Sequence, residues 1–206
     1  MSFSLSEIEA LSRKAARGVG YSWGMAEDAG KSVRWLCSWG LPGAEALARY
    51  LQDRGRAPVQ PEGPIDLSAS TWTAAPAPLC PLMTGAAISD CASQDARLQL
   101  QNVEWPLLLL PQVAWPDHAC TLRWASTTLC WDGTLHLSGP PLTPQADLVT
   151  LSPGANTKGK ACRQTFRANP MPQAKEVLSR FAALTYAPET EMSRRTGAGA
   201  ELVDRD

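Results

Sequence analysis

Apolar residues recur at helical spacing through the first 56 residues, and this pattern predicts three short helices. Ser4 and Glu7 form the S-x-x-E capping box typical of a helix N-terminus, and Gly18 favours a stop. A second helix is expected to follow Ser22 as its N-cap and to end at Gly40, just before the third. The chain is therefore expected to begin as a helical segment over residues 1–56.

Strand patterns dominate from 97 to 168. The run RLQLQNVEW alternates apolar and polar residues, and TTLCWDGTLHL contains Asp132-Gly133, a strong hairpin signal. A two-residue turn there would pair Cys130 with Leu135, and would place Cys130 and His136 on opposite faces of the sheet.

The remaining segments complete the predicted organisation. Residues 57–96 are rich in proline, and we expect an ordered loop with short strands. Residues 172–206 read as a helix followed by a polar, glycine-bearing tail. Together the patterns predict a single α+β domain over residues 1–206, with the N-terminal three-helix segment and the C-terminal helix packed on a mostly antiparallel sheet.

Charge and hydropathy narrow the classes of partner. The formal net charge of -1 excludes the broadly basic surface on which non-specific nucleic-acid binding relies, and leaves only a local basic patch open. The longest apolar run, LLLL at 107–110, is far shorter than the roughly 20 residues of a membrane helix. The first residues, MSFSLSEIEALSRK, are polar and helix-patterned, so we expect them not to be a secretory signal. We expect a soluble, cytoplasmic protein that binds neither nucleic acid nor membrane. The six scattered cysteines are expected to be reduced thiols in the core.

The stretch GANTKGKA, residues 154–161, has the G-x-x-x-x-G-K spacing of a phosphate-binding loop. Such a loop carries Ser or Thr after the lysine and opens a long helix, whereas Ala161 follows Lys160 here and the next residues alternate like a strand. We interpret the stretch as a wide hairpin loop between DLVTL and ACRQTF, and expect no nucleotide cofactor.

Metal and nucleophile motifs are equally sparse. Neither H-E-x-x-H nor paired cysteines occur, so we expect no metal and no cofactor. Tryptophan is abundant, and Trp105, Trp115, Trp124 and Trp131 of the strand region could either line a pocket for an apolar ligand or pack in the core.

The tail after residue 185 is the best candidate for a functional element. Tyr186, Glu191, Ser193 and Arg194 supply two hydroxyls, a carboxylate and a guanidinium, a set able to fix a small anion. If the tail folds against the GVGYSWG turn, the candidate ligand-binding residues become Trp23, Glu27, Tyr186, Glu191, Ser193 and Arg194. The alternative is a solvated C-terminus without function.

Both ends of the chain resemble an uncharacterised bacterial family of unknown function, about 200 residues long. Residues 10–43, with AARGVGYSWGMAEDAGKSVRWL, and 185–206, TYAPETEMSRRTGAGAELVDRD, carry the likeness. The matching positions are Gly18, Gly20, Trp23, Gly24, Glu27, Gly30, Tyr186, Pro188, Glu191, Ser193, Arg194, Gly197, Gly199, Asp204 and Asp206, and the departures are Glu189, Glu201 and Arg205. The resemblance implies that both ends belong to the folded unit, and it carries no activity.

A second, weaker resemblance links the run from Ala26 to Leu41 to the N-terminal helices of malate/lactate-type NAD(P)-dependent dehydrogenases. Those enzymes are much longer, and nothing later in the chain fits them, so we set this alternative aside.

Two functional hypotheses follow. The first is a non-catalytic binder of a small organic acid, or an accessory subunit of a metabolic enzyme, with a small carboxylate or a partner enzyme as its ligand. The alternative is a small-molecule enzyme, such as a lyase, isomerase or hydrolase, with Glu27 or Glu191 as general base and Arg194 as carboxylate anchor. The sequence leaves the ligand, the oligomeric state and the pathway open.

Overall fold

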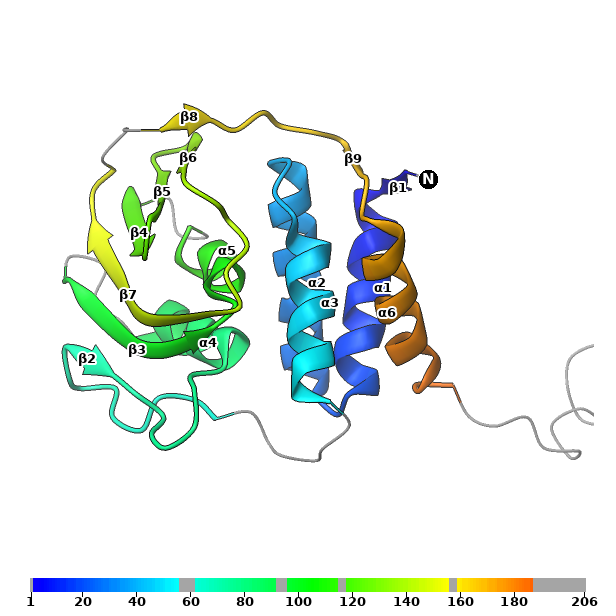
Figure 1. Cartoon of the computed structure of the whole chain (residues 1–206), viewed down its shortest axis with the longest axis horizontal. Helices are drawn as coiled ribbons and strands as arrows, with labels where there is room; N and C mark the ends of the chain where they lie inside the picture. Colours follow the sequence, from blue (N-terminus) through cyan, green and yellow to red (C-terminus); the bar gives the residue numbers. More distant parts are fainter. Residues whose placement is uncertain (1, 56–61, 92–95, 115–117, 156–158, 187–206) are drawn as a thin grey trace, which may run out of the picture.

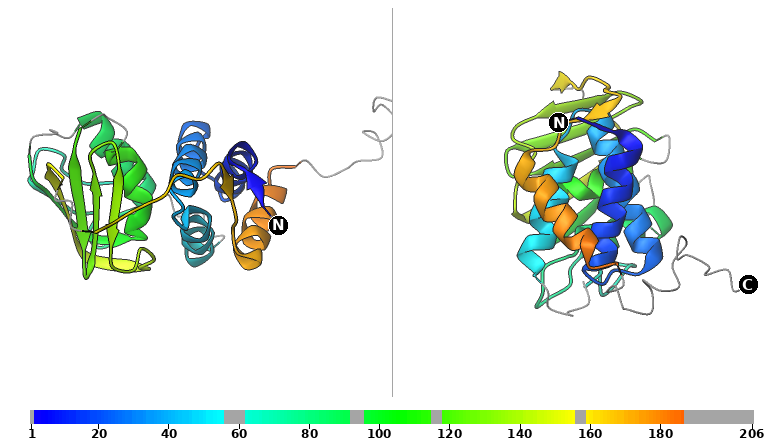
Figure 2. Two further views of the ribbon diagram at one scale, coloured as in Figure 1. Left: turned by 90° about the horizontal axis from the view of Figure 1, so that it is seen from above. Right: turned by 90° about the vertical axis from the view of Figure 1, so that its right-hand side faces the viewer.

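The structure is a computed structural model that describes residues 2–55, 62–91, 96–114, 118–155 and 159–186. A curved sheet and three layers of helices follow one another along the long axis (Figures 1 and 2). From the sheet outward, the layers are α4 (Pro81–Cys91) with α5 (Leu110–Val113), then α2 (Trp23–Ser38) with α3 (Gly43–Arg54), then α1 (Leu5–Gly18) with α6 (Pro172–Ala183). The α+β class predicted from the sequence is confirmed.

Two of the three N-terminal helices, α1 and α2, begin at the capping residues that the sequence predicts. The Ser4 hydroxyl accepts a hydrogen bond from the Glu7 backbone N–H at 3.2 Å, and the Glu7 carboxylate accepts one from the Ser4 backbone at 2.7 Å. At the start of α2, the Ser22 hydroxyl accepts from the Met25 N–H at 3.3 Å. These bonds satisfy amides that a helix start otherwise leaves without partners.

The main sheet has seven strands among the described residues. Its order is β2 (Thr71–Trp72), β3 (Leu98–Glu104), β7 (Gln145–Pro153), β4 (Cys120–Trp124), β5 (Thr127–Trp131), β6 (Leu135–Ser138) and β8 (Lys160–Ala161). Only the β2–β3 pair within it is parallel. The 3-10 helix η1 (Pro106–Leu109) follows β3 and, with α5, buries the apolar run at 107–110 in the core.

A second, two-stranded ladder joins the start of the described chain to the segment before α6. β1 (Phe3–Ser4) pairs antiparallel with β9 (Arg167–Ala168), directly before α1 and shortly before α6 respectively. We call residues 162–166, between β8 and β9, the strap. The strap crosses from the sheet over α2 and α3 to the outermost helices (Figure 2).

The strap is fastened to the C-terminal end of α2. The Thr165 backbone N–H donates to the Ser38 carbonyl at 2.7 Å, and the Thr165 hydroxyl donates to the Cys37 carbonyl at 2.8 Å. At its other end the Cys162 N–H donates to the Leu135 carbonyl at 2.7 Å. Thr165 thereby supplies donors to carbonyls that the end of α2 leaves open.

Helices α1 and α6 pack with almost no space between their last turns. A Cβ atom on Gly18 would lie 1.9 Å from the Phe181 carbonyl oxygen. Only glycine allows this approach, and it sets the end of α6 beside the turn between α1 and α2.

The segment 57–96 differs from the predicted loop with short strands, because its described part also contains the helix α4. Pro81 is the first residue of α4, a position where proline starts a helix without losing a hydrogen bond. The Cys80 sulfur accepts from the Met83 N–H at 3.4 Å, in the manner of an N-cap. The proline pattern predicts breaks in helices, but one of these prolines begins a helix.

The hairpin between β5 and β6 has a different register from the predicted one. Trp131 pairs with Leu135 and Cys130 pairs with His136, so three residues and not two form the turn. The predicted placement of Cys130 and His136 on opposite faces was wrong, because directly paired residues share a face. Among the described residues, no group of three His, Cys, Asp or Glu side chains could hold a metal ion.

The predicted hairpin around GANTKGKA was also wrong. β7 lies between β3 and β4 inside the sheet, whereas β8 pairs with β6 at the edge, so the segment between them crosses the sheet. Residues 159–171 contain no helix, and Lys160 therefore does not stand at a helix N-terminus. In the described part of the chain, no helix is long and apolar enough to cross a membrane.

Candidate functional site

The structure describes three of the six ligand-binding residues predicted from the sequence. Trp23 opens α2 with 65% of its surface exposed, and Tyr186 lies just beyond α6 with 65% exposed. Glu27 lies exposed on α2. Glu191, Ser193 and Arg194 lie outside the described residues.

Two cations of α1, which the sequence analysis missed, each lie against one of the exposed aromatic rings. The Lys14 ammonium lies 5.3 Å from the Tyr186 ring centroid and donates to its hydroxyl at 3.2 Å. The Arg17 guanidinium lies 5.1 Å from the Trp23 ring centroid. Because Lys14 and Arg17 are three residues apart on one helix, both aromatic rings lie at the same end of α1. We call these four side chains the α1 end surface.

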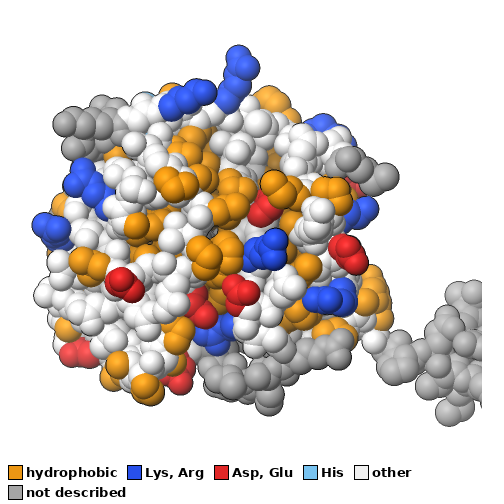
Figure 3. Space-filling view, viewed as in Figure 1, with side chains coloured by type: hydrophobic (Ala, Val, Ile, Leu, Met, Phe, Trp, Pro, Cys, Tyr) orange, Lys and Arg blue, Asp and Glu red, His pale blue; other side chains and the backbone are white. Residues whose placement is uncertain are grey.

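A hollow lies beneath the strap, away from the α1 end surface. We call it the strap cleft; it has a volume of about 760 Å³. Its lining comes from the α2–α3 turn, the end of β6, β8 and the strap, and consists of Trp39, Gly40, Leu41, Leu137, Gly139, Lys160, Ala161, Cys162, Arg163 and Thr165. Hydrophobic side chains gather between the sheet and the middle helices on this face, and basic side chains project at its upper edge (Figure 3).

Three tryptophans give the strap cleft a firm apolar wall. The Trp39 ring meets Trp131 of β5 edge-on at a centroid distance of 5.5 Å, and Trp35 lies 5.4 Å from Trp131 and 6.2 Å from Trp39. Aromatic pairs at these distances and tilts are mutually stabilising. The cluster joins the end of α2 to the sheet, so Trp39 is held in place where it lines the cleft.

The four strand-region tryptophans considered from the sequence have other roles. Trp105 and Trp124 are buried in the core, and the Trp124 indole N–H donates to the Thr143 hydroxyl at 3.0 Å. Trp131 packs in the cluster, and Trp115 lies outside the described residues. The tryptophan that lines the cleft, Trp39, comes from the helical segment, and a helical end position carries no sequence signal for a cleft.

The register of β8 determines where its lysine points. Lys160 is paired with Leu137, so both side chains lie on the same face of the sheet. That face also carries Leu129 and Trp131, through the pairing of Leu129 with Leu137 and the alternation along β5. Lys160 therefore projects on the side of the apolar wall.

The strap cleft is cationic. Lys160 and Arg163 line it, and no Asp or Glu is among the described residues of its lining. Thr165 adds a hydroxyl and Leu41 an apolar wall. An apolar floor with two cations at its rim fits a molecule that combines an apolar body with a carboxylate.

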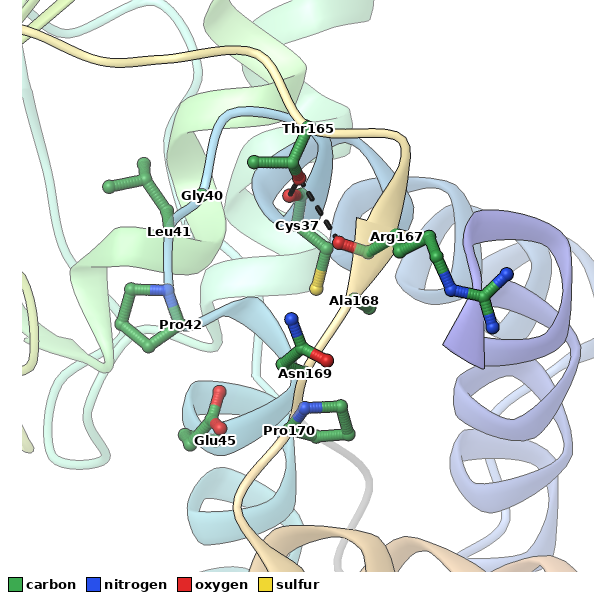
Figure 4. A pocket seen from close by; sticks show the side chains of 10 residues that line it. All are labelled: Cys37, Gly40, Leu41, Pro42, Glu45, Thr165, Arg167, Ala168, Asn169 and Pro170. Atoms are coloured by element: carbon green, nitrogen blue, oxygen red, sulfur yellow. Dashed lines mark hydrogen bonds between the residues drawn. The ribbon is translucent and has the colours of Figure 1, made fainter. Parts of the chain in front are cut away.

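A smaller pocket of about 240 Å³ adjoins the cleft and shares Gly40, Leu41 and Thr165 with it. We call it the Cys37 pocket. The Cys37 sulfur, the Asn169 amide and the Glu45 carboxylate face this hollow, while the Arg167 side chain extends away from it (Figure 4). Its charge is therefore opposite to that of the cleft.

The thiol in this pocket is held in its neutral form. The pKa of Cys37 is raised from 9.0 to about 11, chiefly by burial; the backbone N–H groups of Ala44 and Gly43 oppose this rise, and the negative charge of Glu45 contributes to it. A thiol of this kind is a poor nucleophile at neutral pH. At neutral pH the pocket therefore presents a thiol and not a thiolate.

Two other hollows are less selective. One of about 550 Å³ between α3 and α6 is lined by both acids and arginines, including Glu176 and Arg180. Another of about 230 Å³ is lined by Asp28, Asp90 and Lys31. Mixed charges at their rims favour no one class of ligand, in contrast to the cationic cleft.

Comparison with known proteins finds a family match for the N-terminal part of the chain. Comparison with curated proteins gives no match. Among solved structures, the crystal structure of malate dehydrogenase from Entamoeba histolytica aligns with a TM-score of 0.43 at 10% sequence identity, over 89% of this chain. The chain spans 61% of the length of that protein, and so distant a likeness enters no argument about function. Residues 3–94 match the family described as "Protein of unknown function (DUF3726)", which confirms for this part of the chain the resemblance to an uncharacterised family.

Proposed function

We propose that this protein is a non-catalytic binder of a small organic acid and that the strap cleft is its binding site. The observation that carries the proposal is the placement of Lys160 and Arg163 at the rim of a hollow whose wall is Trp39, Leu41 and Leu137. The apolar wall would hold the body of the ligand, and the two cations would hold its carboxylate. A volume of about 760 Å³ lies within the range of about 300–1,000 Å³ typical of small-molecule sites.

The two cations should contribute a measurable share of the affinity. A hydrogen bond between charged groups contributes about 1.5–3 kcal/mol. Loss of either Lys160 or Arg163 should therefore weaken the binding of a carboxylate about 10- to 100-fold. The guanidinium can bind both carboxylate oxygens at once, so Arg163 is expected to make the larger contribution.

The test is a thermal-shift screen with small carboxylates that carry apolar bodies, followed by calorimetry on those that raise the melting temperature. Lys160→Gln and Arg163→Gln should abolish most of the shift. Arg123→Gln is the matched control, because Arg123 is exposed on the opposite face of the sheet. Equal binding by wild type and both cleft variants, or no binding of any such acid, would refute the proposal.

A second candidate role, as an accessory subunit, rests on the α1 end surface. Exposed Trp23 and Tyr186 with cations against their rings resemble the aromatic anchors of protein interfaces. If a partner enzyme docks there, the double variant Trp23→Ala, Tyr186→Ala should lose a partner that wild type retains during purification. Retention of the same partner by the double variant would contradict docking at this surface.

The enzymatic alternative has less support in the described residues. Glu27 lies on the open surface of α2 and lines none of the hollows described above, so nothing there shields a proton transfer from water. The other catalytic candidates, Glu191 and Arg194, lie outside the described residues. We place the binder in the bacterial cytoplasm, in small-molecule metabolism, as part of the same proposal.

A further inference from the structure

The two cations of the strap cleft are close enough along the chain to act on one small molecule. Arg163 follows Lys160 by three positions, so their Cα atoms lie at most about 11 Å apart. The backbone around Arg163 is held in place, because the N–H groups of Cys162 and Thr165 each donate a hydrogen bond of 2.7 Å. Both cationic side chains are long and flexible, and both line the same hollow.

Neither of these cations has a counter-charge among the described residues. The ion pairs found there join Arg34 to Glu9 and Arg54 to Glu104. The described lining of the cleft contains two positive side chains and no Asp or Glu. Both cations are exposed, so water solvates them in the free protein.

A ligand in the cleft changes this balance. It displaces water from Lys160 and Arg163 together, because both line one hollow with the apolar residues Trp39 and Leu137. A charge that loses water without gaining a partner is destabilising. A monocarboxylate supplies one negative charge for two positive ones, whereas a ligand with two carboxylates supplies a partner for each cation.

We infer that the ligand of the strap cleft is a dicarboxylate with an apolar substituent. One carboxylate lies on Lys160, the other on Arg163, and the substituent on Trp39 and Leu137. This inference rests on the proposed function and narrows the ligand from an organic acid to one with two carboxylates. Carboxylates on adjacent carbons, as in a substituted succinate, are within reach of both flexible side chains. Each contact is a charge-assisted hydrogen bond, which is stronger than a bond between neutral groups.

The test compares ligands that share one apolar body and differ in the number of carboxylates. The first set is benzylsuccinate with 2-methyl-3-phenylpropanoate and 4-phenylbutanoate, each of which lacks one of its two carboxylates. The second set is isobutylsuccinate with 2,4-dimethylpentanoate and 5-methylhexanoate, which are related in the same way. Calorimetry should show that at least one dicarboxylate binds about 10-fold or more tightly than both of its monocarboxylate analogues.

The single variants Lys160→Gln and Arg163→Gln each remove one of the two positive charges. Both side chains are exposed, so the fold should persist, and the melting temperature without ligand checks this. In each variant the dicarboxylate should bind no more tightly than the better of its monocarboxylate analogues. Arg123→Gln, on the opposite face of the sheet, is the matched control and should keep the preference of wild type.

The outcomes distinguish this inference from the proposed function. If the monocarboxylates bind as tightly as the dicarboxylates and the cleft variants weaken both, the inference fails and the organic-acid proposal stands. If either cleft variant keeps the preference for dicarboxylates, that cation does not bind the second carboxylate, and the inference fails as well. If no acid of either set binds, both proposals fail. A preference that both cleft variants lose and the control retains supports the inference.

Discussion

Replacement of Gly18 by alanine tests the packing that brings the end of α6 beside the α1–α2 turn. The added Cβ would lie 1.9 Å from the Phe181 carbonyl oxygen and 2.9 Å from its carbonyl carbon. The contacts are to backbone, which cannot rotate aside as a side chain can. Either α6 must move away from α1, or the last turn of α1 must unwind.

Two opposing effects set the expected loss of stability. Overpacking of this kind costs about 1–3 kcal/mol. Alanine regains up to about 1 kcal/mol over glycine in a helix, and less at the final position. We expect the free energy of unfolding to fall by about 1–2 kcal/mol, which for a chain of this size lowers the melting temperature by about 2–8 °C.

Urea denaturation under reducing conditions measures the change, and Gly24→Ala provides the matched control. Gly24 lies in α2, and a Cβ atom added there would have no neighbouring atom within 4 Å. The same substitution should therefore stabilise there by about 0.5–1 kcal/mol. If Gly18→Ala were as stable as wild type, or if both variants changed in the same direction, the close packing of α1 on α6 would be refuted.

Three further predictions concern buried hydroxyls and thiols. Tyr50→Phe removes the hydroxyl that meets Tyr21 at 2.5 Å and Cys80 at 3.0 Å in the core, and should cost about 1–3 kcal/mol in urea melts, whereas the exposed control Tyr186→Phe should change stability by less than about 0.5 kcal/mol. In the native protein at about pH 8, a thiol reagent should label exposed Cys91 rapidly and buried Cys37 slowly; rapid labelling of both would contradict the burial of Cys37. Burial raises the pKa of Cys37 from 9.0 to about 11, so the folded chain keeps a proton that the unfolded chain has released, and its contribution to stability should be lost as the pH rises from about 9 to 11. Cys37→Ala should flatten the decline of the urea midpoint over that range, and an unchanged decline would contradict this assignment.

Local signals predicted the helical part of the fold well. The capping box at Ser4 and Glu7 and the N-cap at Ser22 act within a few residues, so the sequence contains all the information that they need. The same kind of local signal failed for α4, which the sequence did not predict. Its buried residues include Pro81, Leu82, Thr84, Gly85 and Ile88, and a proline at the first position and a glycine inside obscure the helical pattern.

The sheet was harder to predict because its order depends on distant pairings. The strand region was located, but the alternation of apolar and polar residues along β7 and β8 does not predict which strands pair with them. In the β5–β6 hairpin, Asp132-Gly133 favoured a two-residue turn, while the structure uses a three-residue turn in which the Asp132 carboxylate accepts from the Thr134 N–H at 3.1 Å. One extra residue in the turn changes which side chains share a face.

The strap cleft could not have been found from local patterns, since its walls come from residues 39–41, 137–139 and 160–165. The ladder between β1 and β9 and the packing of α6 on α1 require the chain to return from the edge of the sheet to the first helix. The strap makes this connection, and the hydrogen bonds of Thr165 to the Cys37 and Ser38 carbonyls hold it against the end of α2. The lysine that gave GANTKGKA its likeness to a phosphate loop is thereby placed at an edge strand opposite Leu137, where its charge faces an apolar wall. The chemistry of Lys160 is thus determined by strand register and by the route of the strap, and not by the spacing of the glycines that precede it.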